Sequence, residues 1–187
     1  MLEMLKVLTS GRLLVHVLFG FVCGLPLLLT GSLLQAWMND AGVDLSTIGL
    51  FAFVGLPYTL KFLWAPLFDR YTPSLLGRRR GWLLLMQLAL ILSLLLLAFS
   101  QPATSPLLLA VAALLVAFFS ASQAVVVDAS RPESLRDDEP GLGASCYVNA
   151  YRLGMLLASG FFACWAAFLS LRSVYLVMAG ILVAGVP

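Results

Sequence analysis

The chain has 187 residues, of which 61% are hydrophobic and 11% are charged, and its formal net charge is +2. Its mean hydropathy is +1.01. Soluble domains usually carry about 25% charged residues, so this composition excludes an ordinary water-soluble fold. We therefore predict an integral membrane protein whose main solvent is lipid, and the small net charge gives no indication of nucleic-acid binding.

Apolar runs predict an all-α bundle of six transmembrane helices in one domain, residues 1–187. Each run approaches the roughly 20 apolar residues that a membrane-spanning helix needs, and Ser46 is the expected N-cap of the second helix. The first run is too long for a cleavable signal peptide. The expected helices cover residues 13–37, 47–67, 82–100, 106–129, 143–168 and 174–187.

The positions of Lys and Arg predict the orientation of the bundle. Basic residues gather before the first run and in the loops after the second and fourth runs, whereas the opposite loops hold Arg172, Asp40 and Asp44. Because cytoplasmic loops carry an excess of Lys and Arg, we expect the arginine-rich loops and both termini to lie in the cytoplasm.

Arg152 is the clearest charge inside a predicted helix. It lies roughly 15 Å into the fifth span, near the middle of the membrane. Ser145, Asn149 and Ser159 share its helical face, because they are three or seven residues away from it. Such a polar stripe can line a water-filled cavity and bind an anionic group. The alternative is a lock between Arg152 and another helix.

Lys61 and Asp128 lie closer to the cytoplasmic ends of their helices. The long side chain of Lys61 either reaches the lipid headgroups or takes part in function. Pro57, four residues earlier, removes one helical hydrogen bond and predicts a kink. Asp128 lies about 33 Å along the fourth helix from Pro106, where it either anchors the following loop or exchanges protons with a cavity.

Two further features of the first helix bear on packing and binding. Gly20 and Gly24 form a small-xxx-small pair, which predicts the close approach of a neighbouring helix. Gln35 is a polar residue near the outer end of the same helix and a candidate for substrate contact.

The sequence shows none of the common enzyme motifs, such as Gly-x-x-x-x-Gly-Lys, His-Glu-x-x-His or Gly-x-Ser-x-Gly. Its three cysteines, Cys23, Cys146 and Cys164, stand far apart without a Cys-x-x-Cys pair. We expect neither a metal nor another cofactor, and we interpret the chain as a non-enzymatic protein.

The loop after the second helix reads Ala65-Pro66-Leu67-Phe68-Asp69-Arg70-Tyr71 and then Gly77-Arg78-Arg79-Arg80-Gly81. This loop resembles the signature loop of the major facilitator superfamily, in which a charged latch stabilises one state of the cytoplasmic gate. The alternative is a simple positive-inside anchor. The residues of the expected latch are Asp69, Arg70, Arg78, Arg79, Arg80 and Arg131.

Longer segments resemble the AmpG muropeptide permeases of Gram-negative bacteria and cover nearly the whole chain. They are Phe19-Gly20-Phe21, Gly24-Leu25-Pro26, Leu34-Gln35-Ala36-Trp37-Met38, Lys61-Phe62-Leu63-Trp64-Ala65-Pro66, Asp69-Arg70-Tyr71, Gly77-Arg78-Arg79-Arg80-Gly81-Trp82, Phe119-Ser120-Ala121-Ser122-Gln123 and Tyr151-Arg152-Leu153-Gly154-Met155.

The resemblance implies a proton-driven importer of the bacterial inner membrane. Its substrates would be anhydromuropeptides, the GlcNAc–anhydroMurNAc sugars with attached peptide that cell-wall turnover releases. Asp128 would take part in proton coupling. Substrate contacts would come from Arg152, Asn149, Gln35, Lys61 and Gln123.

The chain departs from the family pattern in the fourth helix. The family usually has an acidic residue directly after the Gln, and here that position is Ala124. Only the second acid, Asp128, is present, so coupling by a pair of carboxylates is not expected. Pro132 follows soon after, and we expect it to end the helix.

The chain has half the length expected of the family, in which the substrate binds between two six-helix halves. The partners implied are lipid, protons, a muropeptide and either the missing C-terminal half or a second copy of the chain. The alternative is a non-transporting membrane protein, either a truncated product or an interaction subunit.

Overall fold

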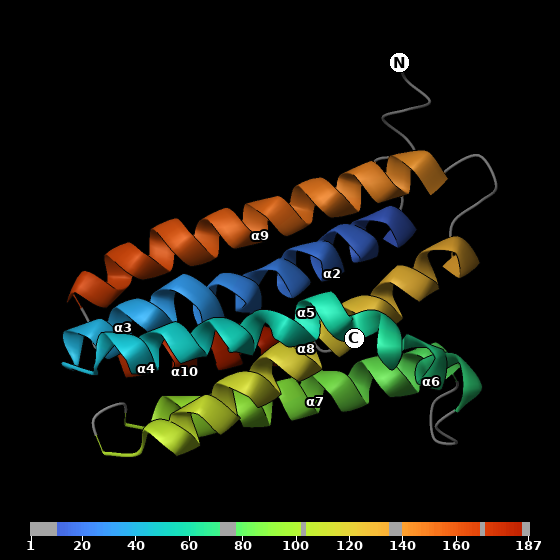
Figure 1. Ribbon diagram of the computed structural model, residues 1–187. Helices are drawn as coiled ribbons and strands as arrows, with labels where there is room; N and C mark the ends of the chain where they lie inside the picture. The colour runs from blue at the N-terminus through green and yellow to red at the C-terminus, as the bar shows by residue number, and fades with distance from the viewer. Residues whose placement is uncertain (1–10, 72–77, 102–103, 135–139, 169–170, 185–187) are drawn as a thin grey trace.

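A computed structural model describes residues 11–71, 78–101, 104–134, 140–168 and 171–184. Within these residues every regular element is a helix, which confirms the predicted all-α class (Figure 1). The long helices lie roughly along one direction as a bundle.

The first helix contains a π-helical turn. It comprises α2 (Gly11–Leu28), η1 (Leu29–Leu33) and α3 (Leu34–Asp40), three residues longer at its C-terminus than expected. The wider turn disturbs the regular hydrogen-bond ladder. The Tyr175 hydroxyl donates a hydrogen bond of 3.0 Å to the Leu29 carbonyl, and the Thr30 hydroxyl donates one of 3.0 Å to the Pro26 carbonyl. Side-chain hydroxyl groups therefore provide hydrogen-bond donors for backbone carbonyls at and just before the π-helical turn.

The second helix is broken into short pieces: α4 (Leu45–Leu50), η2 (Phe51–Gly55), α5 (Leu56–Leu60), η3 (Lys61–Leu63) and α6 (Ala65–Arg70). Pro57 lies in the first turn of α5, directly after a 3-10 segment. Because proline cannot donate a backbone hydrogen bond, this irregularity agrees with the predicted effect of Pro57.

The start of α4 differs from the prediction. The helix begins at Leu45 with Asp44 as its N-cap residue, so the prediction that Ser46 caps it was wrong. The Ser46 hydroxyl instead donates a hydrogen bond to the Asp44 carboxylate. This hydrogen bond lowers the pKa of Asp44, which lies outside the membrane-spanning helices.

The remaining helices are α7 (Arg78–Phe99), α8 (Pro106–Ser134), α9 (Pro140–Phe168) and α10 (Leu171–Ala184). The expectation that Pro132 ends the fourth helix was wrong, because α8 continues to Ser134. Pro132 lies in the last turn, where a proline costs one hydrogen bond but leaves few further turns to disrupt.

The helices pack in pairs. Figure 1 shows α9 beside α2 and α7 beside α8, and α10 packs against α7 while α2 also contacts α8. The core between these pairs contains leucines that are fully buried, such as Leu29, Leu94 and Leu182, together with the Tyr175 ring. The packing places α2 between α8 and α9, which bear the polar residues discussed below.

The outer surface of the bundle is apolar. Large side chains point outward along several helices, for example Leu107, which is 78% exposed, and Leu92, which is 67% exposed. A soluble monomer rarely exposes so continuous an apolar surface. This surface agrees with lipid as the solvent of the chain.

Among the residues that the structure describes, four helices are long and apolar enough to cross a membrane: Val17–Asp40, Leu45–Leu63, Arg80–Phe99 and Pro106–Ser130. A shorter apolar helix covers Arg172–Val183. The predicted count of six spans therefore stays a prediction.

The predicted close approach at Gly20 and Gly24 is confirmed. A Cβ atom at Gly20 would lie 2.7 Å from the Tyr147 carbonyl oxygen, and one at Gly24 would overlap the Tyr151 carbonyl oxygen. From the other side, a Cβ atom at Gly154 would overlap the Phe21 carbonyl oxygen. Backbone contact between α2 and α9 thus requires these glycines.

We expect Gly24→Leu to lower the free energy of unfolding in detergent by about 1–3 kcal/mol or more, because the side chain must push α9 away from α2. Thermal unfolding followed by circular dichroism measures the change. Gly160→Ala is the matched control on α9, since a Cβ atom there meets nothing within 4 Å. Equal effects of the two substitutions would contradict the tight α2–α9 contact.

Candidate functional site

A polar pocket of about 430 Å³ opens between α5, η3, α8 and α9. We call it the charged pocket, because it contains three of the charged residues that the sequence singled out. Its walls are formed by Tyr58, Lys61, Ala124, Asp128, Tyr147, Val148, Tyr151, Arg152 and Met155.

Lys61 and Asp128 form an ion pair in this pocket. The Lys61 Nζ atom lies 3.6 Å from Asp128 Oδ2, and the two side chains are 40% and 36% exposed. This contact joins the irregular second helix to α8. Both charges therefore face the pocket. If Lys61 only reached the lipid headgroups, or if Asp128 only anchored the following loop, the two side chains would not need to meet.

Arg152 lies near the middle of α9 and contributes a second cation to the pocket. Its side chain is exposed, and in the described part of the chain no carboxylate lies within 4.0 Å of it. The site thus holds two cations and one carboxylate, an arrangement suited to an anionic ligand. Asn149, three residues earlier, is also exposed, and its side-chain amide donates to the Ser145 carbonyl at 2.9 Å.

Sequence reasoning missed the aromatic wall of the pocket. The Tyr147 and Tyr151 rings stack with their centroids 6.4 Å apart, and Tyr58 lies one turn before Lys61. The i, i+4 spacing of Tyr147 and Tyr151 on the helix of Arg152 was the signal that could have indicated them. Aromatic rings of this kind can stack on the apolar face of a sugar or peptide.

Ala124 also lines the charged pocket, one helical turn before Asp128. The acid that the family usually has after the Gln would therefore point into this same space. The alanine at position 124 thus gives the pocket one negative charge fewer than an acidic residue at that position would.

Gln123 does not lie in the charged pocket, although the sequence grouped it with the substrate-contacting residues. Its side chain is 1% exposed and donates a hydrogen bond to the Gln87 side chain on α7. Gln87 in turn donates to the Leu182 carbonyl on α10 at 2.7 Å. In this structure Gln123 helps to hold α7, α8 and α10 together.

We expect Gln87→Leu to lower the free energy of unfolding by about 1–3 kcal/mol, because the Gln123 amide and the Leu182 carbonyl both lose a buried partner. Gln123→Leu should lower the free energy of unfolding by less, since the hydrogen bond from Gln87 to the Leu182 carbonyl remains. Chemical unfolding in detergent measures the order of the two effects. The reverse order would contradict this network.

The other predicted residues lie apart from the pocket. Gln35 is half-buried on α3 and is not among the lining residues. Asp69 and Arg70 are exposed in the last turn of α6, and Arg80 is exposed near the start of α7. The side chains of Arg78, Arg79 and Arg131 lie outside the described residues, so the latch stays a prediction.

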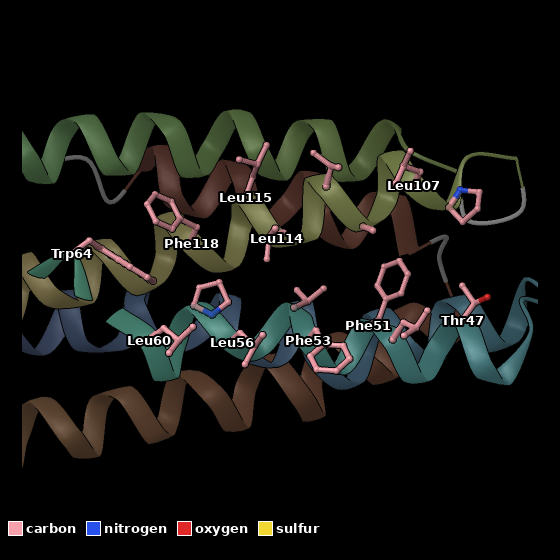
Figure 2. Close-up of a pocket in the computed structure, with 16 residues that line it drawn as sticks. Thr47, Phe51, Phe53, Leu56, Leu60, Trp64, Leu107, Leu114, Leu115 and Phe118 are labelled. Atoms are coloured by element: carbon pink, nitrogen blue, oxygen red, sulfur yellow. The ribbon is translucent and has the colours of Figure 1, made fainter. Parts of the chain in front are cut away.

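A larger pocket of about 780 Å³ lies between the broken second helix and α8. Figure 2 shows Phe53, Leu56 and Leu114 among the side chains around it. Its walls are almost entirely apolar and contain no charged residue. A carboxylate would lose its hydration there without gaining a partner, so the smaller, charged pocket is the candidate site.

The amino-acid sequence matches a known family of proteins. The family model described as Major Facilitator Superfamily matches residues 13–187, and the chain belongs to this family. It is a membrane protein, as the composition predicted.

The predicted resemblance to muropeptide permeases is also confirmed. The chain is 44% identical over 183 residues to the anhydromuropeptide permease of Escherichia coli K12, covering 97% of this chain and 37% of that protein. It is 44% identical to an uncharacterized protein of Haemophilus influenzae, covering 95% of this chain and 42% of that protein. A protein of Rickettsia conorii, provisionally named transporter AmpG 1, is 35% identical, covering 93% and 43%. The chain thus spans about two fifths of the length of these curated relatives.

Proposed function

We propose that the chain forms one half of a proton-coupled importer of anhydromuropeptides in the bacterial inner membrane. The observation that carries this proposal is the meeting of Arg152, Lys61 and Asp128 in one pocket inside a helical bundle. Charges within membrane-spanning helices are costly and mark transport pathways. The similarity to the E. coli anhydromuropeptide permease supports the choice of substrate.

Each residue of the site has a role in this proposal. Arg152 binds a carboxylate of the muropeptide, Lys61 supports it, and Asp128 takes up the coupled proton. Asn149 and Gln35 donate hydrogen bonds to sugar or peptide as the two halves close around the substrate. The protein acts as a transporter and not as an enzyme, since no reacting group is needed to move a substrate unchanged.

The topology belongs to the same proposal. Six helices cross the membrane with both termini in the cytoplasm, and the arginines at the end of α6 and the start of α7 form part of a cytoplasmic gate latch. In transporters of this type the substrate binds between two halves. The second wall of the site then comes from a C-terminal half or from a second copy of the chain.

A chimera tests the proposal. This chain is joined to the part of the E. coli permease that follows the matched region, and the product is expressed in a permease-deficient strain. We expect uptake of a radiolabelled GlcNAc–anhydroMurNAc tripeptide, and we expect a proton uncoupler to abolish it. A chimera that inserts into the membrane but imports nothing would contradict the transport role.

A non-transporting interaction subunit is the second candidate. The apolar side chains exposed around the larger pocket favour it, because such a surface can pack against another membrane protein. Expression of the chain alone distinguishes the two. Stable membrane insertion without uptake, combined with failure of the chimera, would support the subunit over the transporter.

A further inference from the structure

The charges in the pocket do not balance. Lys61 and Arg152 contribute two positive charges, and Asp128 contributes one negative charge when it is ionised. The described lining residues therefore carry a net charge of about +1 near neutral pH. A ligand with one anionic group neutralises the site in this state.

The contact between Lys61 and Asp128 is loose enough to exchange partners. Its distance of 3.6 Å exceeds the roughly 2.7–2.9 Å of a tight charge-assisted hydrogen bond. Both side chains are also more than a third exposed, so the pocket hydrates them and the pair contributes little net stability. A carboxylate on a ligand can therefore compete with Asp128 for the Lys61 ammonium group.

We propose that Asp128 is an internal competitor for Lys61, and that its protonation converts the pocket into a site for a ligand with two anionic groups. This inference rests on the proposed function and deepens it. A proton binds one carboxylate oxygen of Asp128, and the ion pair with Lys61 breaks. Lys61 then binds one carboxylate of the ligand while Arg152 binds the other.

Charge balance links the proton to the ligand. With a protonated Asp128 the two cations carry +2, which a dianionic ligand neutralises, whereas a monoanionic ligand leaves one cation without a partner inside the membrane. Each additional negative charge on the ligand is thus matched by one proton. This preference selects muropeptides whose peptide carries at least two free carboxylates.

The titratable groups that face Asp128 are Lys61 from η3, Tyr58 from α5, Cys23 from α2, and Tyr147, Tyr151 and Arg152 from α9.

Two nearly isosteric probes test this idea on the purified chimera in lipid nanodiscs. N-acetylmuramyl-L-alanyl-D-glutamate carries two carboxylates, and N-acetylmuramyl-L-alanyl-D-isoglutamine carries one. The measured quantity is the ratio of their affinities, diacid over monoacid, at pH 7.5. Asp128→Asn mimics the protonated carboxyl group, and we expect it to raise this ratio about tenfold, which corresponds to about 1.4 kcal/mol.

Further variants assign the effect to Lys61. In the Asp128→Asn background, Lys61→Gln should return the ratio to that of the wild type, and Lys61→Arg should retain the gain because the cation is kept.

The outcomes separate this inference from the proposed function. Binding of both probes with the same ratio in the wild type and in Asp128→Asn would overturn the competitor role and leave the proposed function standing. Binding of neither probe, by wild type or variants that retain their helical circular-dichroism spectrum, would overturn both. A tenfold gain that persists after Lys61→Gln would also refute the role assigned to Lys61.

Discussion

Replacement of Arg152 by alanine is expected to abolish muropeptide import by the chimera without loss of membrane insertion. The guanidinium group lies near the middle of α9 and opens into the charged pocket. Loss of a charge-assisted hydrogen bond costs about 1.5–3 kcal/mol, which corresponds to roughly 10- to 150-fold weaker binding. Uptake of the radiolabelled tripeptide and its binding to the purified chimera measure the two effects.

Arg152→Lys separates the charge from the geometry of the guanidinium group. Lysine keeps the positive charge but loses the planar fork that binds a carboxylate through two parallel bonds, so an intermediate affinity is expected. Arg172→Ala is the matched control, because Arg172 lies on α10 with its guanidinium carbon 4.6 Å from the centre of the Phe99 ring and outside the pocket. Normal import by Arg152→Ala, or equal losses in the two alanine variants, would remove Arg152 from the site.

The helices could be predicted from the sequence because a bilayer allows few alternatives. A chain without water around it must satisfy its backbone groups within each span, so a long apolar run becomes a helix. The same reasoning anticipated the close approach at Gly20 and Gly24 from their spacing. It could not identify Gly154 as their counterpart, because the small-xxx-small pattern does not say which helix is the neighbour.

The ion pair between Lys61 and Asp128 could not be predicted from the sequence pattern. Lys61 begins a 3-10 turn that follows η2 and α5, and such turns have about 3.0 residues instead of 3.6. The direction of the Lys61 side chain therefore cannot be obtained from an ideal helical wheel. Only the packed bundle shows that it meets Asp128.

The placement of Gln123 was within reach of the sequence. Gln123 and Asp128 are five residues apart, so on a regular helix their side chains point about 140° away from each other. Ala124 and Asp128, four residues apart, point in nearly the same direction. A polar residue on a transmembrane helix thus does not have to line the cavity, and here Gln123 packs against α7.

Removal of Lys61 alone is expected to harm the protein more than removal of the whole ion pair. Lys61→Met removes the ammonium group beside the Asp128 carboxylate in a membrane-spanning helix, which costs free energy even in a hydrated pocket. Since both side chains are more than a third exposed, we expect a loss of no more than about 1 kcal/mol in the free energy of unfolding. Chemical unfolding of the purified chain in detergent gives this value.

The double variant Lys61→Met/Asp128→Asn should recover most of that stability, because it removes the carboxylate together with the ammonium group. It should not recover import by the chimera, since the proposed mechanism requires a carboxylate that takes up the proton and a cation that the substrate can bind. If the double variant restored both stability and import, the pair would serve only to join η3 to α8, and proton coupling would have to reside elsewhere in the transporter.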